Sequence, residues 1–233
     1  MMTSIQQGDF LGGLPGAVRD AVLRTAEPVA LESGACLIKC GQPTRYAHFV
    51  ESGFLSAAAD NGNGSGVEVG LIGREGMVGS WLTLGSSEAP FDVVVRNAGR
   101  ALRLSAAVFA QACIDHPELR SAALVHCHRF TAMVADTCQA QARLTVEARL
   151  ARWLLLAHDR IEDDNLPITH DVLSKTLGVR RPGVTVALHV LEGEHMLKST
   201  RGLIQILDRE KLERTARAPC RGQVAPQTTA AIA

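Results

Sequence analysis

Short apolar runs separated by turn residues fill the first half of the chain. Their β-forming character and spacing of about 8 to 12 positions predict strands, at residues 28–31, 35–39, 47–50, 54–58, 67–72, 77–82, 92–96 and 101–104. A loop rich in glycine and asparagine interrupts them at 60–66. Ahead of the strands, residues 14–24 carry Pro15 in a first turn, as helices tolerate. The pattern is typical of a helix followed by an all-β sandwich or barrel.

After Leu104 the pattern changes to that of helices. Ser105 can cap a helix at 106–113, and Asp115 can cap the next. From Pro117 to about Val146 no glycine or further proline interrupts the chain, which predicts a helix of about eight turns. A partly apolar stripe runs along it at spacings of three and four, formed by Leu119, Ala123, His126, Phe130, Val134, Thr137, Gln141 and Leu144.

This stripe fits two arrangements: a helix packed on its own β-domain, or a seam between two identical chains. We favour the seam because the segment joins two differently built halves. Its candidate residues are Ala123, Phe130, Val134, Thr137 and Gln141. A further helix is predicted at 146–160.

Residues 166–209 have the pattern of a helix-turn-helix followed by a hairpin. Thr169 is a suitable N-cap for a helix at 171–177, and Gly178 suits the left-handed turn that ends it. A second helix begins at Arg181 and runs to about Glu194. Two helices joined by a short glycine-containing turn form a unit whose second member enters the DNA major groove. The extended pieces within 196–206 predict a wing.

The net charge of the whole chain argues against a DNA partner, whereas the charge of its C-terminal half supports one. The net charge of 0 argues against nucleic acid, because affinity for phosphates rests on positive charge. However, residues 1–118 carry a net charge of −4 and residues 119–233 a net charge of +4. Arginine reads guanine through a bidentate fork, and an arginine at a wing tip can touch a phosphate. The candidate DNA-binding residues are Arg180, Arg181, Thr185, Thr169 and Arg201.

Several motifs carry a resemblance to a known family. They are Val146-Glu147-Ala148-Arg149-Leu150-Ala151-Arg152-Trp153-Leu154-Leu155, Ile168-Thr169, Leu177-Gly178-Val179-Arg180-Arg181, Arg201-Gly202 with Leu207-Asp208-Arg209, and Gly73-Arg74-Glu75-Gly76-Met77-Val78-Gly79. Over roughly 14–217 the chain resembles the bacterial Crp/Fnr superfamily of transcription regulators. The resemblance implies an α+β fold with an N-terminal β-roll of the cyclic-nucleotide-binding type, a long dimerisation helix and a C-terminal winged helix-turn-helix. We expect these at 1–116, 117–146 and 147–217, followed by a disordered tail at 218–233.

The recognition helix departs from the family pattern. Arg181 takes the place of the first base-reading arginine. The next such place, usually acidic, is Pro182, and a further arginine place is Val186. The resemblance therefore implies an operator other than the best-known one.

The effector site departs further. Gly79 is followed by Ser80 where the family's cyclic-nucleotide cassette has glutamate, and the phosphate positions fall at Pro90-Phe91. A cyclic phosphate needs a charge-matched donor such as arginine. The adenine positions are Val134 and Ala135, which complete the candidate effector pocket with Gly79 and Ser80. Cyclic AMP is not expected to bind, and the β-roll either binds an unidentified small molecule or is a rigid dimerisation platform.

Other chemistry is weakly indicated. No cysteine pair has Cys-x-x-Cys spacing, no secretion signal is evident, and no apolar run reaches the roughly 18 residues that span a bilayer. We therefore expect a reduced, cytoplasmic protein off the membrane. On a helix, neighbours diverge by about 100°, so His126-Cys127-His128 cannot bind one metal from a single chain, although a dimer could bring copies of His126 or Cys127 together. No metal or cofactor is expected.

The sequence thus predicts a homodimeric, sequence-specific DNA-binding regulator and not an enzyme. Its partners are a palindromic operator in double-stranded DNA, read by a recognition helix at about 181–194, a second copy of the chain and RNA polymerase. One alternative is a cupin-like metal-dependent enzyme, which is opposed by His48 being the only histidine in the strand region. Another is a ligand-sensing interaction module without DNA binding, which Arg180, Arg181 and Arg201 oppose.

Overall fold

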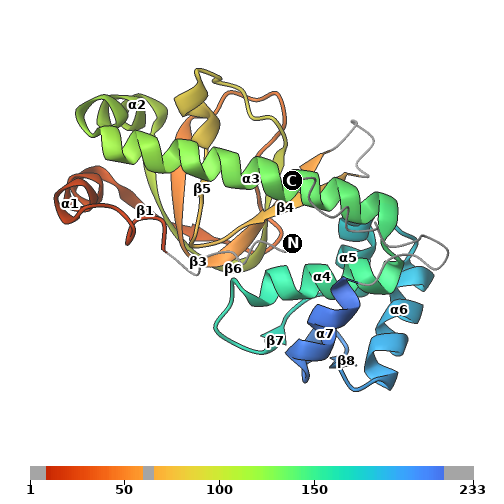
Figure 1. Ribbon diagram of the computed structural model, residues 1–233. Coiled ribbons are helices and arrows are strands. Elements are labelled where there is room, and N and C mark those ends of the chain that lie inside the picture. The colour runs from red at the N-terminus through yellow and green to blue at the C-terminus, as the bar shows by residue number, and fades with distance from the viewer. Residues whose placement is uncertain (1–8, 60–65, 218–233) are drawn as a thin grey trace, which may run out of the picture.

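The computed structural model of the protein describes residues 9–59 and 66–217. A β-roll with helices at one end is followed by a long helix and then by a smaller helical unit with its own small sheet (Figure 1). This mixture of helices and antiparallel sheet confirms the predicted α+β class. The predicted disordered tail at 218–233 and most of the loop predicted at 60–66 lie outside the described residues.

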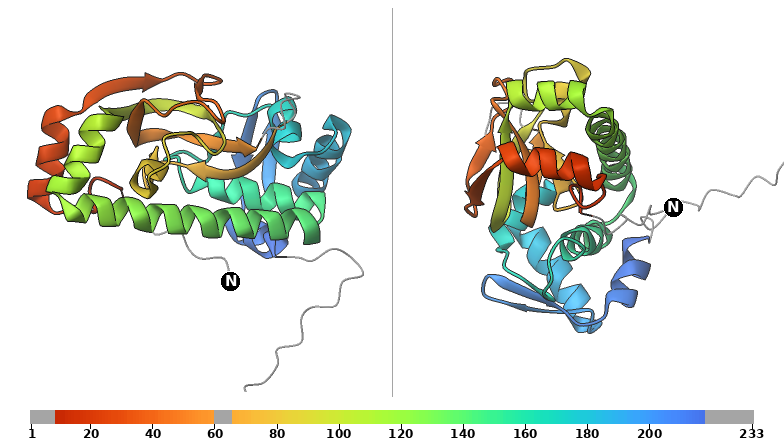
Figure 2. Two further views of the ribbon diagram at one scale, coloured as in Figure 1. Left: turned by 90° about the horizontal axis from the view of Figure 1, so that it is seen from above. Right: turned by 90° about the vertical axis from the view of Figure 1, so that its left-hand side faces the viewer.

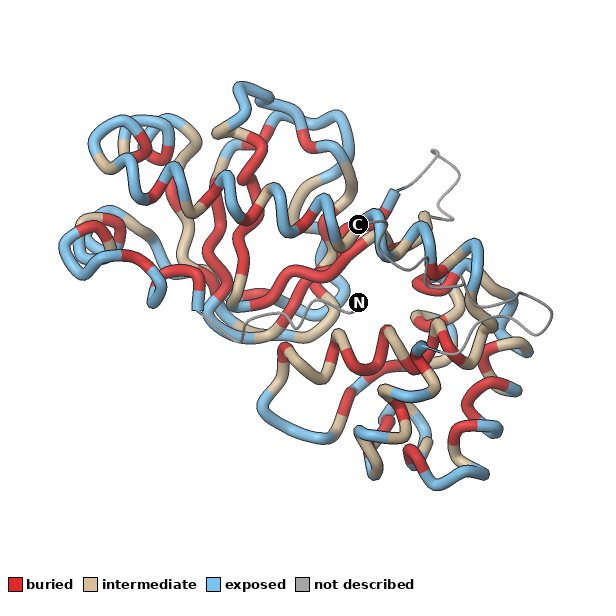
Figure 3. The backbone as a smooth tube through the Cα atoms, in the orientation of Figure 1, coloured by how far each residue is buried: buried red, intermediate tan, exposed pale blue. Residues whose placement is uncertain are grey.

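The β-roll follows helix α1 (Gly16–Thr25) and contains one six-stranded antiparallel sheet. Its strands are β1 (Glu27–Leu31), β2 (Cys36–Ile38), β3 (Tyr46–Ala59), β4 (Val67–Ile72), β5 (Met77–Val78) and β6 (Asp92–Ser105). The order is β1-β6-β3-β4, with β2 also paired to β6 and β5 to β3. Figure 3 shows that the buried stretches of the roll follow its strands.

In two places, two strands that the sequence predicts separately are parts of one long strand. Residues 47–50 and 54–58 both belong to β3, and the two predicted strands between 92 and 104 both belong to β6. The pairing continues because register shifts absorb the irregular residues between Val50 and Leu55. Gly53 has φ +74°, and a Cβ there would lie 2.5 Å from a carbonyl oxygen of β6. The prediction at 77–82 was wrong beyond Val78, because the left-handed Gly79 turns the chain into a 3₁₀ helix, η1 (Ser80–Leu84).

The long helix α3 (Pro117–Arg143) follows α2 (Ala106–Asp115) and lies along the whole length of the β-roll (Figure 2). It ends three residues earlier than predicted. Leu144 is extended, and Thr145 caps α4 (Val146–His158) by accepting a hydrogen bond from the Ala148 backbone N–H at 3.2 Å. Two residues therefore separate the long helix from everything that follows.

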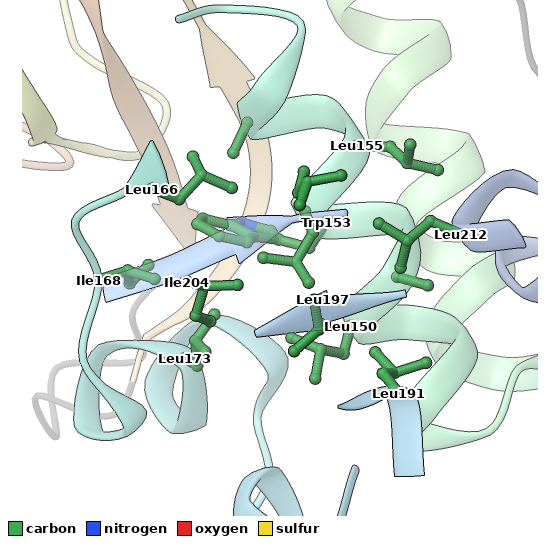
Figure 4. Packing of buried hydrophobic residues seen from close by; sticks show 14 of the residues in the cluster. Leu150, Trp153, Leu155, Leu166, Ile168, Leu173, Leu191, Leu197, Ile204 and Leu212 are labelled. Carbon is green, nitrogen blue, oxygen red and sulfur yellow. The ribbon is translucent and has the colours of Figure 1, made fainter. Parts of the chain in front are cut away.

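The C-terminal unit combines a helix-turn-helix with a three-stranded sheet. Its elements after α4 are β7 (Asn165–Leu166), α5 (His170–Leu177), α6 (Arg181–Gly193), β8 (Leu197–Thr200), β9 (Leu203–Ile206) and α7 (Arg209–Ala216). The core between them includes Leu150 and Trp153 of α4 and Leu191 of α6 (Figure 4). Phe54 and Leu71 of the β-roll belong to the same cluster, so the two units share part of a core. No helix among the described residues is long and apolar enough to cross a membrane.

Candidate nucleic-acid interface

The turn between α5 and α6 has the geometry that the sequence predicts. Thr169 Oγ1 accepts a hydrogen bond from the Val172 backbone N–H at 3.3 Å and so caps α5. Gly178 ends that helix at φ +62°, a left-handed conformation that costs an L-residue with a side chain roughly 1–2 kcal/mol. Helix α6 then begins at Arg181, with Pro182 in its first turn.

The two helices are held by buried faces turned toward each other and toward α4. Leu173 and Leu177 of α5 are buried, and so are Val184, Leu188 and Leu191 of α6. Residues on the opposite face of α6 do not take part in this packing. That face is the one available to a duplex.

The three arginines predicted for DNA contact are all exposed. Arg180 is the N-cap residue of α6 and Arg181 is its first helical residue. Arg201 lies at the tip of the β8–β9 hairpin, next to Gly202 at φ +77°. Within residues 9–59 and 66–217 none of the three side chains has a hydrogen-bond or ion-pair partner. Their guanidinium groups are therefore available to an external anion or base.

Thr185 is placed differently from the arginines. Its side chain is half-buried, and its Oγ1 donates to the Arg181 carbonyl at 3.3 Å and lies 3.2 Å from His170 Nδ1. The hydroxyl thus links α6 to the first turn of α5. Thr169 likewise uses its oxygen to cap α5, as the sequence predicts. Both hydroxyls thus have a structural role in the unit, and the DNA contact assigned to them stays a prediction.

The residues that hold this unit against the β-roll were not predicted from the sequence. Glu68 of β4 is 5% exposed and accepts a hydrogen bond from Trp153 Nε1 of α4. Arg96 Nε of β6 lies 3.9 Å from the second carboxylate oxygen. Burial raises the pKa of Glu68 to about 7, against the smaller opposing effects of Ser56, Arg96 and Trp153.

A second contact across the junction joins Arg160, which follows α4, to the β4–β5 loop. Its guanidinium pairs with the Glu75 carboxylate at 2.6 Å, and the Arg160 side chain is 1% exposed. Closer to the recognition unit, Arg149 of α4 donates to the Leu177 carbonyl at 3.4 Å and to the Gln141 side chain at the end of α3. A Cβ on Gly178 would lie 3.2 Å from Val67 of β4. The turn of the helix-turn-helix is therefore in contact with the β-roll.

Comparison with known families agrees with this architecture. The model of the Crp-like helix-turn-helix domain matches residues 148–215, and that of the cyclic nucleotide-binding domain matches residues 28–116. The chain belongs to the Crp/Fnr superfamily of transcription regulators. A search of curated proteins finds no match.

Solved structures with the same fold include members of the Crp/Fnr family. A transcriptional regulator of this family from Thermus thermophilus is 24% identical, with a TM-score of 0.67 over 82% of this chain and 99% of the other. FixK2 from Bradyrhizobium japonicum is 14% identical, with a TM-score of 0.71 over 83% and 98%. The c-di-GMP responsive regulator CLP from Xanthomonas campestris is 17% identical, with a TM-score of 0.66 over 82% and 99%. At these identities the likeness shows the fold alone.

In this Crp/Fnr chain, aromatic side chains fill the interior of the β-roll near the expected effector pocket. The ring centroids of Trp81 and Phe91 are 5.5 Å apart, and those of Phe91 and Phe130 are 5.1 Å apart. Trp81 Nε1 donates to Thr44 Oγ1 at 2.7 Å. Phe91, one of the two positions that replace the family's phosphate-binding residues, is thus packed against the chain's own rings.

Three of the four pocket candidates lie on the inner side of the roll within one chain, and the fourth lies on the outer side of α3. Gly79 and Ser80 are buried at the start of η1, and Val134 packs against the core of the roll. Ala135 is exposed on the outer side of α3. Adjacent helical residues point about 100° apart, so within one chain Ala135 does not face the same side as Val134, and its place in an effector pocket stays a prediction.

Several of the seam candidates make contacts within the chain itself, and the predicted seam stays a prediction. Ala123 is 0% exposed, and Phe130 lies in the aromatic cluster just described. Val134 packs on the roll, while Gln141 accepts the hydrogen bond from Arg149. Thr137 donates its hydroxyl to the Met133 carbonyl within α3. These contacts agree with the alternative that the sequence left open, a helix packed on its own domain.

Two of the histidines singled out in the sequence, His126 and His48, are buried within the fold. His126 Nε2 accepts a hydrogen bond from the Met77 backbone N–H at 3.4 Å, and burial lowers the pKa of His126 to about 4. A buried His126 cannot meet its copy in a second chain. His48 lies beside Tyr46, and burial together with Arg103 lowers the pKa of His48 to about 4. No group of three or more potential metal ligands occurs among the described residues.

Proposed function

We propose that this Crp/Fnr regulator is a sequence-specific DNA-binding homodimer whose helix α6 enters the major groove of a palindromic operator. The observation that carries the proposal is the exposed pair Arg180 and Arg181 on the first turn of a helix whose other face is buried. The N-terminal residues of a recognition helix are those that reach base edges. Arg181 is assigned to a guanine, and Arg201 on the wing to a phosphate.

The surface of α3 that faces away from the β-roll supports the dimer. Exposed residues recur along it at alternating spacings of four and three: Leu124, His128, Thr131, Ala135, Cys138 and Ala142. An average spacing of about 3.5 residues is the repeat of two helices that pack along their length. Ala135, Cys138 and Ala142 have small side chains, which allow close approach. We assign this stripe, and not the one predicted from the sequence, to the second copy.

A charge placed in the stripe tests the dimer. Leu124→Arg is expected to convert the protein to a monomer in sedimentation-velocity experiments, because two like charges would meet across the two-fold axis. Glu118→Arg adds an arginine to the same helix outside the stripe and is expected to leave the dimer intact. A Leu124→Arg protein that remains dimeric would contradict the assignment.

Binding to selected genomic fragments tests the main proposal. Fluorescence anisotropy is expected to show tight, salt-sensitive binding to some fragments and much weaker binding to the rest. Arg181→Ala should cost roughly 1–3 kcal/mol per half-site and relax the sequence preference at one position. Arg24→Ala, which replaces an exposed arginine on α1, is the matched control and should bind as the wild type does. Absence of any sequence preference in the wild type would refute the proposal.

The packed interior of the roll supports the rigid-platform alternative over an effector bound inside it. Trp81, Phe91 and Phe130 occupy the interior next to η1, so a nucleotide would have to displace them. An effector such as the c-di-GMP to which CLP responds would need another site. Contact with RNA polymerase and a cytoplasmic location follow from the proposed role and stay predictions.

The enzyme alternative has less support. A cupin-like site needs several histidine and carboxylate ligands converging from strands. His48 instead faces Arg103, whose positive charge helps to lower the pKa of the imidazole. The superfamily consists of regulators, which also favours a non-enzymatic role.

A further inference from the structure

The outward face of α6 is unusually apolar for a helix assigned to DNA. Pro182, Val186, His189 and Gly193 recur at spacings of four, three and four, opposite the buried face. Val186 is 59% exposed at the middle of this stripe, and Val190 at its side is 43% exposed. The stripe contains no lysine, arginine, glutamine or asparagine.

Packing within the chain does not explain why residue 186 is a valine. The buried side of α6 is complete without it, since Val184, Ala187, Leu188 and Leu191 are each 0% exposed. Valine is also a poorer helix former than alanine or the long polar residues. A single exposed valine is ordinary on a protein surface, but this one lies five residues, or about one and a half turns, beyond the proposed base-reading arginine.

The polar groups near Val186 are mostly engaged. The hydroxyl of Thr185 is used by the Arg181 carbonyl and His170. The guanidinium of Arg181 is the exposed polar group that precedes the stripe. The imidazole of His189 is a second exposed polar group on this face, three residues beyond Val186. Hydrogen bonds from this face therefore come from Arg181 and His189, and the contact area of Val186 between them is aliphatic.

We infer that Val186, with Pro182 beside it, reads the C5-methyl groups of thymine in the major groove; the inference rests on the proposed function. Thymine is the base that presents a methyl group in that groove, and apolar side chains are its usual partners. Arg181 and Val186 are separated by a rise of about 7.5 Å along the helix, which corresponds to roughly two steps of about 3.4 Å along the duplex. The half-site is thus assigned a guanine for Arg181 and, about two base pairs away, thymine for Val186.

Uracil substitution tests this assignment, because it removes the thymine methyl and leaves the hydrogen-bonding edges in place. A preferred operator is first selected from random duplexes with the full-length protein. Each thymine of a half-site is then replaced by uracil in turn. Burying one methyl is worth about 0.8 kcal/mol, so the wild type should lose about four-fold in affinity at one or two positions. Thymines outside the half-sites are the control and should show no loss.

Val186→Ala completes the experiment. This exposed site lies on a helix that favours alanine, so the variant is expected to fold, which its thermal unfolding checks. The variant should bind the thymine operator more weakly than the wild type and should no longer distinguish thymine from uracil. An equal uracil penalty in both proteins, or no penalty in the wild type, would overturn the thymine assignment while leaving DNA binding intact. Failure of the wild type to select any operator would instead refute the proposed function.

Discussion

Glu68 and Trp153 are joined by a buried hydrogen bond that links strand β4 of the sensor-like roll to helix α4 of the DNA-binding unit. The arginines that face this carboxylate are Arg96 from β6 and Arg152 and Arg160 from α4 and the residues after it. Burial outweighs their attraction and raises the pKa of Glu68 to about 7. The carboxyl group therefore holds a proton near neutral pH.

Because the pKa of Glu68 is raised, its contribution to the free energy of unfolding changes with pH in a known direction. The folded protein holds the Glu68 proton more tightly than the unfolded chain, whose pKa is near 4.5. The stability that Glu68 contributes is fully present below pH about 4.5 and is lost as the pH rises through about 7. Compared with Glu68→Gln, which keeps an acceptor for Trp153 but does not titrate, the wild type should lose up to about 3 kcal/mol across this window.

Urea denaturation of both proteins from about pH 4.5 to about pH 8 measures the difference. His48 and His126, whose pKa values burial lowers to about 4, destabilise the native state as the pH falls below about 6.5. They are present in both proteins, so their effect cancels in the comparison. Parallel stability curves for the wild type and Glu68→Gln would show that the carboxyl group does not couple the two units to pH.

The left-handed turn at Gly178 predicts a loss of stability on substitution. Gly178→Ala should cost roughly 1–2 kcal/mol, because alanine at a positive φ is strained and its Cβ would lie 3.2 Å from Val67. Gly193→Ala is the control, since a Cβ there meets nothing within 4 Å and alanine favours a helix. Thermal unfolding compares the two. Equal melting temperatures for the two variants would mean that the backbone at residue 178 accommodates alanine without a loss of stability.

The wing arginine should affect DNA binding differently from Arg181. Arg201→Ala is expected to weaken binding to every sequence alike and to reduce the salt-dependence slope by roughly one per half-site, because one phosphate contact is lost. Titrations of preferred and random duplexes at several salt concentrations measure both effects. Loss of discrimination with an unchanged slope would instead assign Arg201 to a base.

The aromatic packing of the roll predicts that cyclic AMP has no effect on stability. A ligand present at about a hundred times its Kd stabilises the native state by about 2.7 kcal/mol. Cyclic AMP at about 1 mM should leave the melting temperature unchanged, because Trp81, Phe91 and Phe130 fill the interior of the roll and no arginine stands at Pro90-Phe91. A rise in melting temperature would show that these rings move aside.

The sequence predicted the helix-turn-helix closely because its signals are local. Thr169, Gly178 and the buried positions of α6 each act within one or two turns of the chain. The faces of β4 and α3 could not be predicted in this way. Alternation would turn Val67 and Val69 inward, yet these two are only partly buried whereas Glu68 and Gly70 are buried. The carboxyl group of Glu68 can point inward there because partners from distant parts of the chain, Trp153 and Arg96, lie next to it.

The same limit applies to the two faces of α3. Helical spacing shows that a stripe is buried but not what buries it, and the β-roll covers the stripe that contains Ala123 and Phe130. Burial by the chain itself leaves the opposite stripe exposed. Only the fold distinguishes the two faces.

The two residues between α3 and α4, Leu144 and Thr145, limit how the DNA-binding unit can move. An extended pair spans about 7 Å, so the unit cannot travel far from the end of α3. In the proposed dimer, that short tether sets the separation of the two recognition helices. An added base pair between half-sites would turn one of them by about 34–36° around the duplex. Such a protein should tolerate changes in the base sequence of its operator more readily than any change in the spacing between the two half-sites.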